Sequence, residues 1–297
     1  MDVDWLMALA GFGVGFVVGL TGMGGGALMT PILVLLFNVP PLQAVSSDIV
    51  ASMVMKPVGG GVHLKKGTVN LRLVAWLVVG SVPAAFLSVW GLQQFADPEQ
   101  VNDVVQYAVG IALLLASLGL AVKGAFSGRR GVNDRALRNV SVRPLRTLGI
   151  GVFGGAMVGL TSVGSGSLMM VLLLLLYPAL SAKQLVGTDL VQAIPLVAAA
   201  AVAHMLFGEV QFGITGALLI GAIPGVYIGA HVSSRAADHV IRPILAMVLI
   251  VSGLKMLHVP TEVVGGVALA LAALTALVIL RTPAAESDDL AVEPILE

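Results

Sequence analysis

Cysteine is absent from the 297-residue sequence, and charged residues make up only 11% of it. The absence of cysteine excludes disulfides, thiolate metal sites and cysteine nucleophiles. The chain also lacks a P-loop and any nucleic-acid-binding module, so we expect neither ATP hydrolysis nor nucleic acid as a partner. Hydrophobic residues, in contrast, make up 58% of the chain and the mean hydropathy is +1.00. This composition predicts an integral membrane protein whose principal surroundings are the lipid bilayer.

Apolar stretches recur along the whole chain. They run at about 5–20, 26–37, 44–64, 71–91, 104–122, 147–161, 166–177, 184–206, 212–232, 240–257 and 262–280. Most approach the roughly 20 residues that a helix needs to cross a bilayer. The exceptions are two pairs of short stretches, 5–20 with 26–37 and 147–161 with 166–177, each separated by a Gly-rich break. We interpret each pair as a re-entrant hairpin whose tip lies inside the membrane.

The two halves of the chain repeat one pattern. Residues 19–29 read GLTGMGGGALM, and residues 159–169, which follow 140 positions later, read GLTSVGSGSLM. Further along, the correspondence continues at 141 positions, so that Ser47-Asp48 matches Thr188-Asp189 and His63 matches His204. Glycine-interrupted apolar segments at matching places in two halves indicate the binding site of a transporter. Movement of a substrate, rather than catalysis, is therefore the leading interpretation.

Charge in the loops predicts the orientation. The linker 123–146 carries seven basic residues and one acid, so we expect it to be cytoplasmic. Lys65 and Lys66 follow the third apolar stretch, whereas the matching loop of the second half carries Glu209 and no base. This difference predicts an all-α polytopic fold of two inverted repeats, with seven full spans and two hairpins, the N-terminus outside and the C-terminus inside. A parallel repeat, with each Gly-rich segment crossing once, stays an alternative, because acidic residues contribute little to orientation.

These features divide the chain into five parts. They are a first transmembrane repeat (1–122), a basic cytoplasmic linker (123–146), a second repeat (147–257), an additional helix (258–280) and a tail (281–297). Each repeat is expected to hold one Gly-rich hairpin and three transmembrane helices. Within the hairpins, glycines at four-residue spacing indicate close helix packing. These glycines are Gly11, Gly15, Gly19, Gly151, Gly155 and Gly159. Glycine faces of this kind also suit subunit contacts, so a homo-oligomer stays open.

The Gly-rich breaks form the first candidate site. Glycine lets the backbone approach a ligand closely. A helix that restarts after a break directs unsatisfied N–H groups and the positive end of its dipole into that break, and such an end binds anions. The candidate substrate-binding residues are Thr21, Gly22, Gly24, Gly25 and Gly26 in the first half, and Thr161, Ser162, Gly164, Ser165, Gly166 and Ser167 in the second.

A second group of candidates follows each break. Ser47-Asp48 and Thr188-Asp189 each stand near the start of an apolar stretch, where capping of a helix explains them. The functional alternative is that the Ser47 and Thr188 hydroxyls contact substrate. In that alternative Asp48 and Asp189 bind protons that couple to transport, since acids within a membrane often act as relays.

One lysine and two histidines complete the candidates. Lys56 is the one base well inside an apolar stretch, and its repeat mate is Val197. It either balances an anion or extends toward the membrane surface. His63 and His204 lie near the ends of matching stretches, where we expect interfacial hydrogen bonding, with proton handling as the alternative. Two histidines without further ligands form no metal motif, and no cofactor is expected.

The quoted motifs together resemble a known family. GLTGMGGGALMTP, AVSSD, LVGTD and the Gly-x-x-Pro pairs at Gly80 and Gly221 are similar to the sulfite exporter TauE/SafE permease family over about residues 11–257. The resemblance implies a prokaryotic inner-membrane carrier that exports sulfite or moves sulfonates and related sulfur oxyanions. It assigns the site to Gly22–Gly26 and Ser162–Ser167, with Ser47-Asp48 and Thr188-Asp189. The second break departs from a pure glycine run at Ser165, so the two half-sites differ.

Three functions follow from these observations. The first is a secondary carrier that exports a small inorganic or organic sulfur oxyanion by alternating access, with protons as the candidate coupling ion. The second is an uptake permease or a channel for a related anion such as sulfate or thiosulfate. The third, from a different class, is an intramembrane serine hydrolase that uses Ser165 with His204. The repeat mate of Ser165 is Gly25, and duplication of the whole unit fits transport rather than proteolysis.

Overall fold

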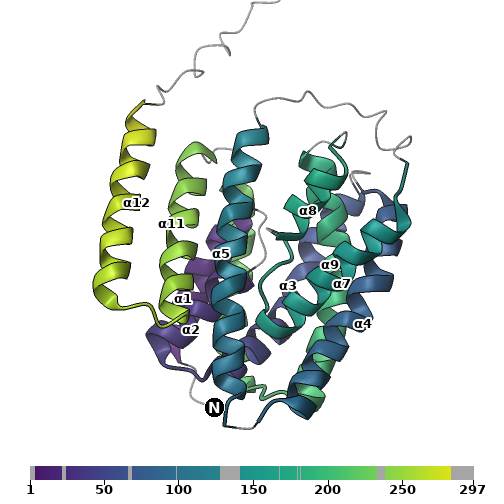
Figure 1. The fold of residues 1–297 in the computed structure, drawn as a ribbon, viewed down its shortest axis with the longest axis horizontal. Helices are drawn as coiled ribbons and strands as arrows, with labels where there is room; N and C mark the ends of the chain where they lie inside the picture. The colour runs from purple at the N-terminus through teal and green to yellow at the C-terminus, as the bar shows by residue number, and fades with distance from the viewer. Residues whose placement is uncertain are drawn as a thin grey trace, which may run out of the picture.

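The computed structural model describes residues 4–21, 25–65, 69–97, 99–127, 141–166, 168–178, 180, 182–232 and 238–281. In these ranges all regular structure is helical (Figure 1), which confirms the expected all-α class. The first half holds α1 (Trp5–Thr21), α2 (Gly26–Phe37), α3 (Pro41–Lys65), α4 (Leu71–Phe95) and α5 (Val101–Ser127). The second half holds α7 (Pro144–Thr161), α8 (Leu168–Leu176), α9 (Ala182–Phe207), α10 (Phe212–Val232) and α11 (Asp238–Met256), followed by α12 (Thr261–Arg281).

Four of the described helices have the length and composition of membrane spans. They contain the apolar segments Leu71–Phe95, Val101–Ala121, Gln184–Phe207 and Phe212–Gly229 of α4, α5, α9 and α10. α3 is as long as α4, at 25 residues, but it carries Asp48 and Lys56 in its interior. The described parts of α1, α2, α11 and α12 form shorter apolar helices. The chain is therefore a multi-pass membrane protein, and the full count of seven spans stays a prediction.

The first helix of each half packs against the fourth helix of the other half. These pairs are α1 with α10 and α7 with α4. Glycine permits this close approach, because a Cβ at Gly15 would lie 2.5 Å from the Ala222 carbonyl oxygen, and one at Gly151 would lie 2.5 Å from that of Leu77. From the contact Gly11–Leu218 to the contact Gly15–Ala222 the residue number rises by four on both helices, so α1 and α10 run in the same direction. The packing role expected of the glycines at four-residue spacing is thus confirmed for Gly11, Gly15, Gly151, Gly155 and Gly159.

Two further pairs join equivalent helices of the two halves. On α3 and α9, Ser46 lies beside His204, whereas Gly60 lies beside Leu190, so these two helices run antiparallel. α5 and α11 lie side by side (Figure 1) and are also antiparallel. In that pair Gln106 lies 3.4 Å from the His258 ring just after α11, while Leu114 contacts Gly253 within it.

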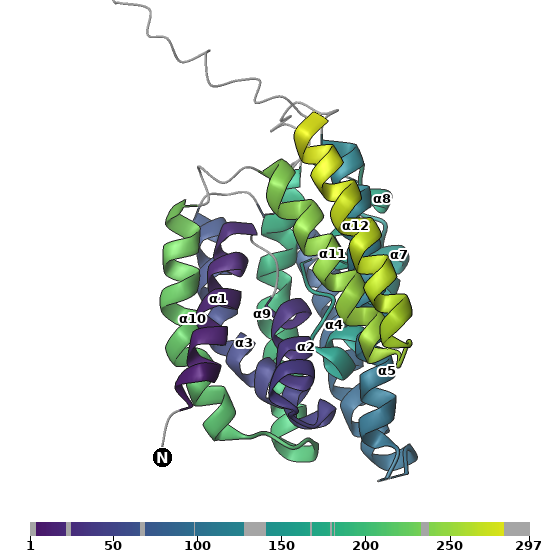
Figure 2. The same cartoon turned by 90° about the vertical axis from the view of Figure 1, so that its left-hand side faces the viewer.

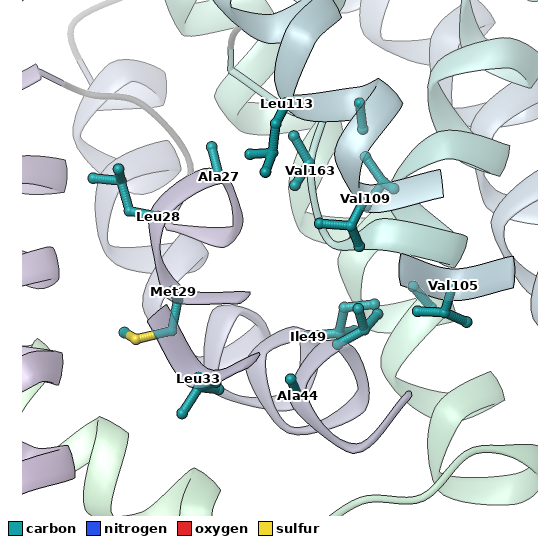
Figure 3. Packing of buried hydrophobic residues seen from close by; sticks show 14 of the residues in the cluster. Ala27, Leu28, Met29, Leu33, Ala44, Ile49, Val105, Val109, Leu113 and Val163 are labelled. Atoms are coloured by element: carbon teal, nitrogen blue, oxygen red, sulfur yellow. The ribbon is translucent and has the colours of Figure 1, made fainter. Parts of the chain in front are cut away.

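The main apolar core surrounds the short helix α2. Figure 3 shows side chains of α2, α3 and α5 meeting there with Val163, which belongs to the break after α7. The labelled residues are Ala27, Leu28, Met29, Leu33, Ala44, Ile49, Val105, Val109, Leu113 and Val163. A smaller cluster joins α4 and α8 through Leu73, Leu77, Met169 and Leu173. Because lipid is as apolar as these side chains, tight packing rather than exclusion of water holds such a core together in a bilayer.

Two further features lie outside this core: a contact between the ends of α7 and α8, and the last helix, α12. The backbone N–H of Arg143 donates to the Tyr177 hydroxyl at 2.8 Å, so the start of α7 and the end of α8 meet. α12 lies outside the paired halves against α11 (Figure 2). Apolar side chains cover its outer surface, with Leu269 75% exposed, as a lipid-facing helix requires. It has no counterpart in the first half, in keeping with an additional helix.

Candidate functional site

The two Gly-rich breaks meet in the interior. Gly26, the first residue of α2, contacts the carbonyl group of Ser162, the residue that ends α7, so closely that a Cβ at position 26 would collide with it. Ser162 has a left-handed backbone with φ of 59°, and its N–H donates to the Val158 carbonyl at 2.8 Å. The contact joins the start of α2 directly to the end of α7. Only glycine fits at position 26.

Left-handed glycines shape the second break. Gly164 has φ of 133° and Gly166 has φ of 104°, values that other residues rarely adopt. The chain then enters α8, where the Met169 N–H donates to the Gly164 carbonyl at 3.0 Å. The Thr161 hydroxyl donates to the Met157 carbonyl at 2.6 Å and accepts the Val163 N–H at 3.1 Å. Thr21, its repeat mate, donates to the Val17 carbonyl at 2.8 Å. These two threonines therefore hold the ends of α7 and α1.

Asp48 projects from α3 toward this junction and is only 2% exposed. Its Oδ2 accepts the Thr30 hydroxyl of α2 at 3.1 Å, and the carboxylate also accepts a hydrogen bond from Ser162. α3 begins at Pro41 and α9 at Ala182, so both Asp48 and Asp189 lie well inside their helices. Capping of their own helices, the structural explanation considered from the sequence, is therefore wrong for both.

Lys56 lies two turns beyond Asp48 on α3 and is 9% exposed. Its Nζ donates to the Ser165 Oγ in the second break. The ammonium also interacts electrostatically with both carboxylates, Asp48 and Asp189. Extension toward the membrane surface is therefore the wrong interpretation of Lys56, because the side chain turns into the interior and reaches the break.

Asp189 lies on α9 and is 2% exposed. Its Oδ1 accepts the Gln192 amide at 3.0 Å, and the Gln192 Oε1 in turn accepts the Ser81 hydroxyl of α4 at 3.3 Å. This chain of bonds links α9 to α4 through groups that are all buried. Buried polar groups of this kind are stable only when such partners are present.

Ser47 and Thr188 make reciprocal bonds across the two halves. The Ser47 Oγ accepts the backbone N–H of Gln211 at 3.1 Å, and the Thr188 Oγ1 accepts the backbone N–H of Asn70 at 3.1 Å. The two pairs correspond at 141 positions, as the repeat does. Each hydroxyl thereby ties one half to the segment before α10 or α4 of the other half. The structure places these two hydroxyls against backbone rather than against Lys56.

His204 has both ring nitrogens engaged. Its Nε2 lies 2.8 Å from the Gly159 carbonyl and its Nδ1 lies 2.8 Å from the Ser46 Oγ, which also accepts the Glu209 N–H at 3.3 Å. A carbonyl only accepts, so Nε2 carries a proton. His204, which is 1% exposed, thus joins α9 to α3 and α7 through hydrogen bonds, and its expected place at the membrane interface stays a prediction. Ser165 bonds Lys56 instead, so the structure does not bring together the Ser165–His204 pair that a serine hydrolase requires.

The remaining candidates fall outside the described part of the chain. These are Gly22, Gly24, Ser167 and the side chain of His63. Among described residues, no group of three or more His, Asp or Glu side chains is placed to hold a metal ion.

Sequence reasoning missed Thr30, Ser81 and Gln192, which bond the two aspartates or their partner. A usable signal existed for Thr30, since it is the one polar side chain of α2.

Comparisons with known proteins identify the family. Residues 7–256 match the sulfite exporter TauE/SafE family. Three proteins of Bacillus subtilis (strain 168) are similar. "Probable membrane transporter protein YjnA" is 38% identical over 84% of this chain and 98% of its own. "Probable membrane transporter protein YdhB" is 24% identical over 85% and 99%, and "Probable membrane transporter protein YunE" is 24% identical over 85% and 97%.

No solved structure matches the chain significantly. The family match covers both breaks and both aspartates, and four of the described helices have the length and composition of membrane spans. This chain is a multi-pass membrane transporter that belongs to the sulfite exporter TauE/SafE family.

Proposed function

We propose that the chain is a secondary transporter that exports a small sulfur oxyanion, sulfite or an organosulfonate, from a prokaryotic cell across its inner membrane. The observation that carries this proposal is the buried ammonium of Lys56 on the Ser165 hydroxyl at a Gly-rich break. A buried cation in a membrane segment is costly and marks a functional site. Because Lys56 contacts a break after which a helix begins, the first N–H groups of that helix can share an anion with the ammonium.

The proposed site uses both breaks. α2 begins at Gly26 beside Ser162, and α8 begins at Leu168 after Gly164–Gly166, so two helix N-termini lie next to the junction. We assign substrate contact to Ser165, Lys56 and the backbone of Gly25, Gly26 and Gly164–Gly166. The hydroxyls of Thr21 and Thr161 hold the helix ends before the breaks, whereas those of Ser47 and Thr188 tie the two halves together, since each bonds to main chain.

Alternating access is proposed to arise from two inverted halves with re-entrant hairpins. Antiparallel contact between α3 and α9 supports inversion, because equivalent helices of a parallel repeat run in one direction. The bond between Arg143 and Tyr177 supports re-entrance of α7 and α8, because the pair returns to the end at which it starts. The orientation with the N-terminus outside rests on the basic linker 123–146.

Reconstitution into liposomes tests the proposal. Radiolabelled sulfite, sulfate, thiosulfate and taurine are each offered to wild-type protein and to Lys56→Met, with and without a pH gradient. Saturable flux of sulfite or a sulfonate that Lys56→Met abolishes supports a carrier. Flux of sulfate or thiosulfate alone favours the uptake alternative, and non-saturating current down the gradient favours a channel. Absence of flux for every anion contradicts the proposal.

A further inference from the structure

The proposed site contains more negative than positive side chains. Asp48 and Asp189 are both buried, and Lys56 is the one buried cation that faces them among the described residues. With all three groups ionised, the cluster carries a net charge of one negative unit before any substrate arrives. A low dielectric makes each further uncompensated charge costly.

The other titratable groups that the structure describes do not change this balance. α2, which packs on α3, contains none. His204 of α9 is 1% exposed and bonds the Gly159 carbonyl and the Ser46 hydroxyl, which carry no charge, so burial favours its neutral form. The described titratable side chains of α4, α5, α7 and α10 are exposed and lie apart from the cluster; these are Arg72, Asp103, Tyr107, Arg146, Tyr227 and His231. Among the described residues, the three-residue cluster alone therefore balances the charge of an incoming anion.

We infer that each monovalent oxyanion that binds beside Lys56 is accompanied by one proton, which Asp48 holds. This inference rests on the function proposed above. An anion added alone would bring the buried charge to two negative units. A proton taken up with the anion returns the total to one, the value of the empty cluster, so the interior holds no additional charge. Anion and proton then move together through the same site.

The hydrogen-bond partners of Asp48 suit a group that takes up and releases a proton. Asp48 faces the hydroxyls of Thr30 and Ser162, and a hydroxyl can accept a bond as readily as donate one. When Asp48 is protonated, its carboxyl group can therefore donate to a hydroxyl from which the carboxylate accepted, and the two groups stay hydrogen-bonded. Asp189 faces the Gln192 amide nitrogen, which only donates and therefore favours the ionised form. The Ser81 hydroxyl holds the amide oxygen of Gln192 and so fixes this orientation.

The position of Asp48 gives the proton a path to the substrate site. Ser162, which bonds Asp48, is the residue whose carbonyl contacts Gly26 at the junction of the breaks. Protonation of Asp48 thus changes a bond at the junction itself. The repeat mates of Thr30 and Ser162 are Met170 and Gly22, and neither has a hydroxyl. The proton site, like the Lys56–Ser165 contact, is present in one half.

Calorimetry with methanesulfonate tests the inference, because the charge of this anion does not change around neutral pH. Wild-type protein is titrated in two buffers that differ in ionisation enthalpy, so that the heat difference counts the protons bound. We expect one proton to be bound per anion. At pH values at which Asp48 is ionised in the empty protein, the Kd for the anion should rise about tenfold per pH unit. Asp48→Asn should bind the anion with no proton uptake and no pH dependence. Asp103→Asn, at an exposed acid of α5, should behave as wild type.

The outcomes separate the two proposals. Anion binding to wild-type protein without proton uptake overturns the inference and leaves the proposed function standing. Uptake of a proton by Asp48→Asn overturns the assignment to Asp48. If neither methanesulfonate nor sulfite binds the wild-type protein, the proposed function fails and the inference fails with it. Should Asp48→Asn not fold, the wild-type proton count alone decides.

Discussion

The ammonium of Lys56 and the hydroxyl of Ser165 join the middle of α3 to the break after α7, 109 residues later in the chain. Neither residue has an equivalent in the other half, where the repeat mates are Val197 and Gly25. The breaks are therefore repeated in both halves, whereas the contact between Lys56 and Ser165 is not. Each half supplies a break, and among the described residues the buried cation bonds the second one.

Replacement of Lys56 tests the contact most severely. Lys56→Met keeps the length and apolar volume of the side chain but removes the charge, so we expect transport to fall to background. Lys56→Arg keeps the charge but changes its shape, and should retain reduced flux. Flux into proteoliposomes is the measurement, with monodisperse elution as the check on folding. Normal flux through Lys56→Met would remove Lys56 from the site.

Removal of the Ser165 hydroxyl should weaken substrate binding without unfolding the protein. A hydrogen bond to a charged group contributes about 1.5–3 kcal/mol, so Ser165→Ala should raise the KM for the anion roughly 10- to 100-fold. Ser117→Ala is the matched control. Its hydroxyl is also buried but bonds the Leu114 carbonyl of its own helix at 2.7 Å. Equal effects of the two variants would mean that Ser165 acts only through packing.

Substitution by alanine should lower stability strongly at Gly26 and hardly at all at its neighbour Gly25. At Gly26 a Cβ would meet the Ser162 carbonyl group, so Gly26→Ala should force the breaks apart and cost about 3 kcal/mol or more. At Gly25 the nearest atom to a Cβ is Val18 Cγ2 at 3.8 Å, and φ is −60°, so alanine fits. Thermal unfolding in detergent should show a large loss for Gly26→Ala and little change for Gly25→Ala. Comparable stabilities would contradict the junction.

Orientation can be measured directly because the chain has no cysteine of its own. We expect Glu209→Cys to react with impermeant maleimide from outside intact cells. Arg146→Cys, at an exposed position in α7, should react only after permeabilisation. Both residues lie at helix ends, so the substitutions leave the core intact. Labelling of position 209 solely from the cytoplasm would refute the inverted arrangement.

Sequence patterns predicted the helical class, the two breaks and the additional helix, because hydropathy and glycine runs are local signals. They placed the starts of α3 and α9 too late. The first turns, at Pro41–Gln43 and Ala182–Gln184, contain polar residues and fall outside an apolar window. That error made Asp48 and Asp189 resemble caps. The bonds of Asp48 to Thr30 and Ser162 join separate helices, and no local pattern reports such pairing.

The most direct measurement of the central claim locates an anion in the folded protein. A structure determined with 2-bromoethanesulfonate, with the bromine identified by anomalous scattering, shows where the sulfonate binds. We predict a sulfonate on Lys56 and Ser165, facing the start of α8, with the chain broken at Gly164–Gly166. A continuous helix through those residues, or a sulfonate bound only at the surface, would contradict the account.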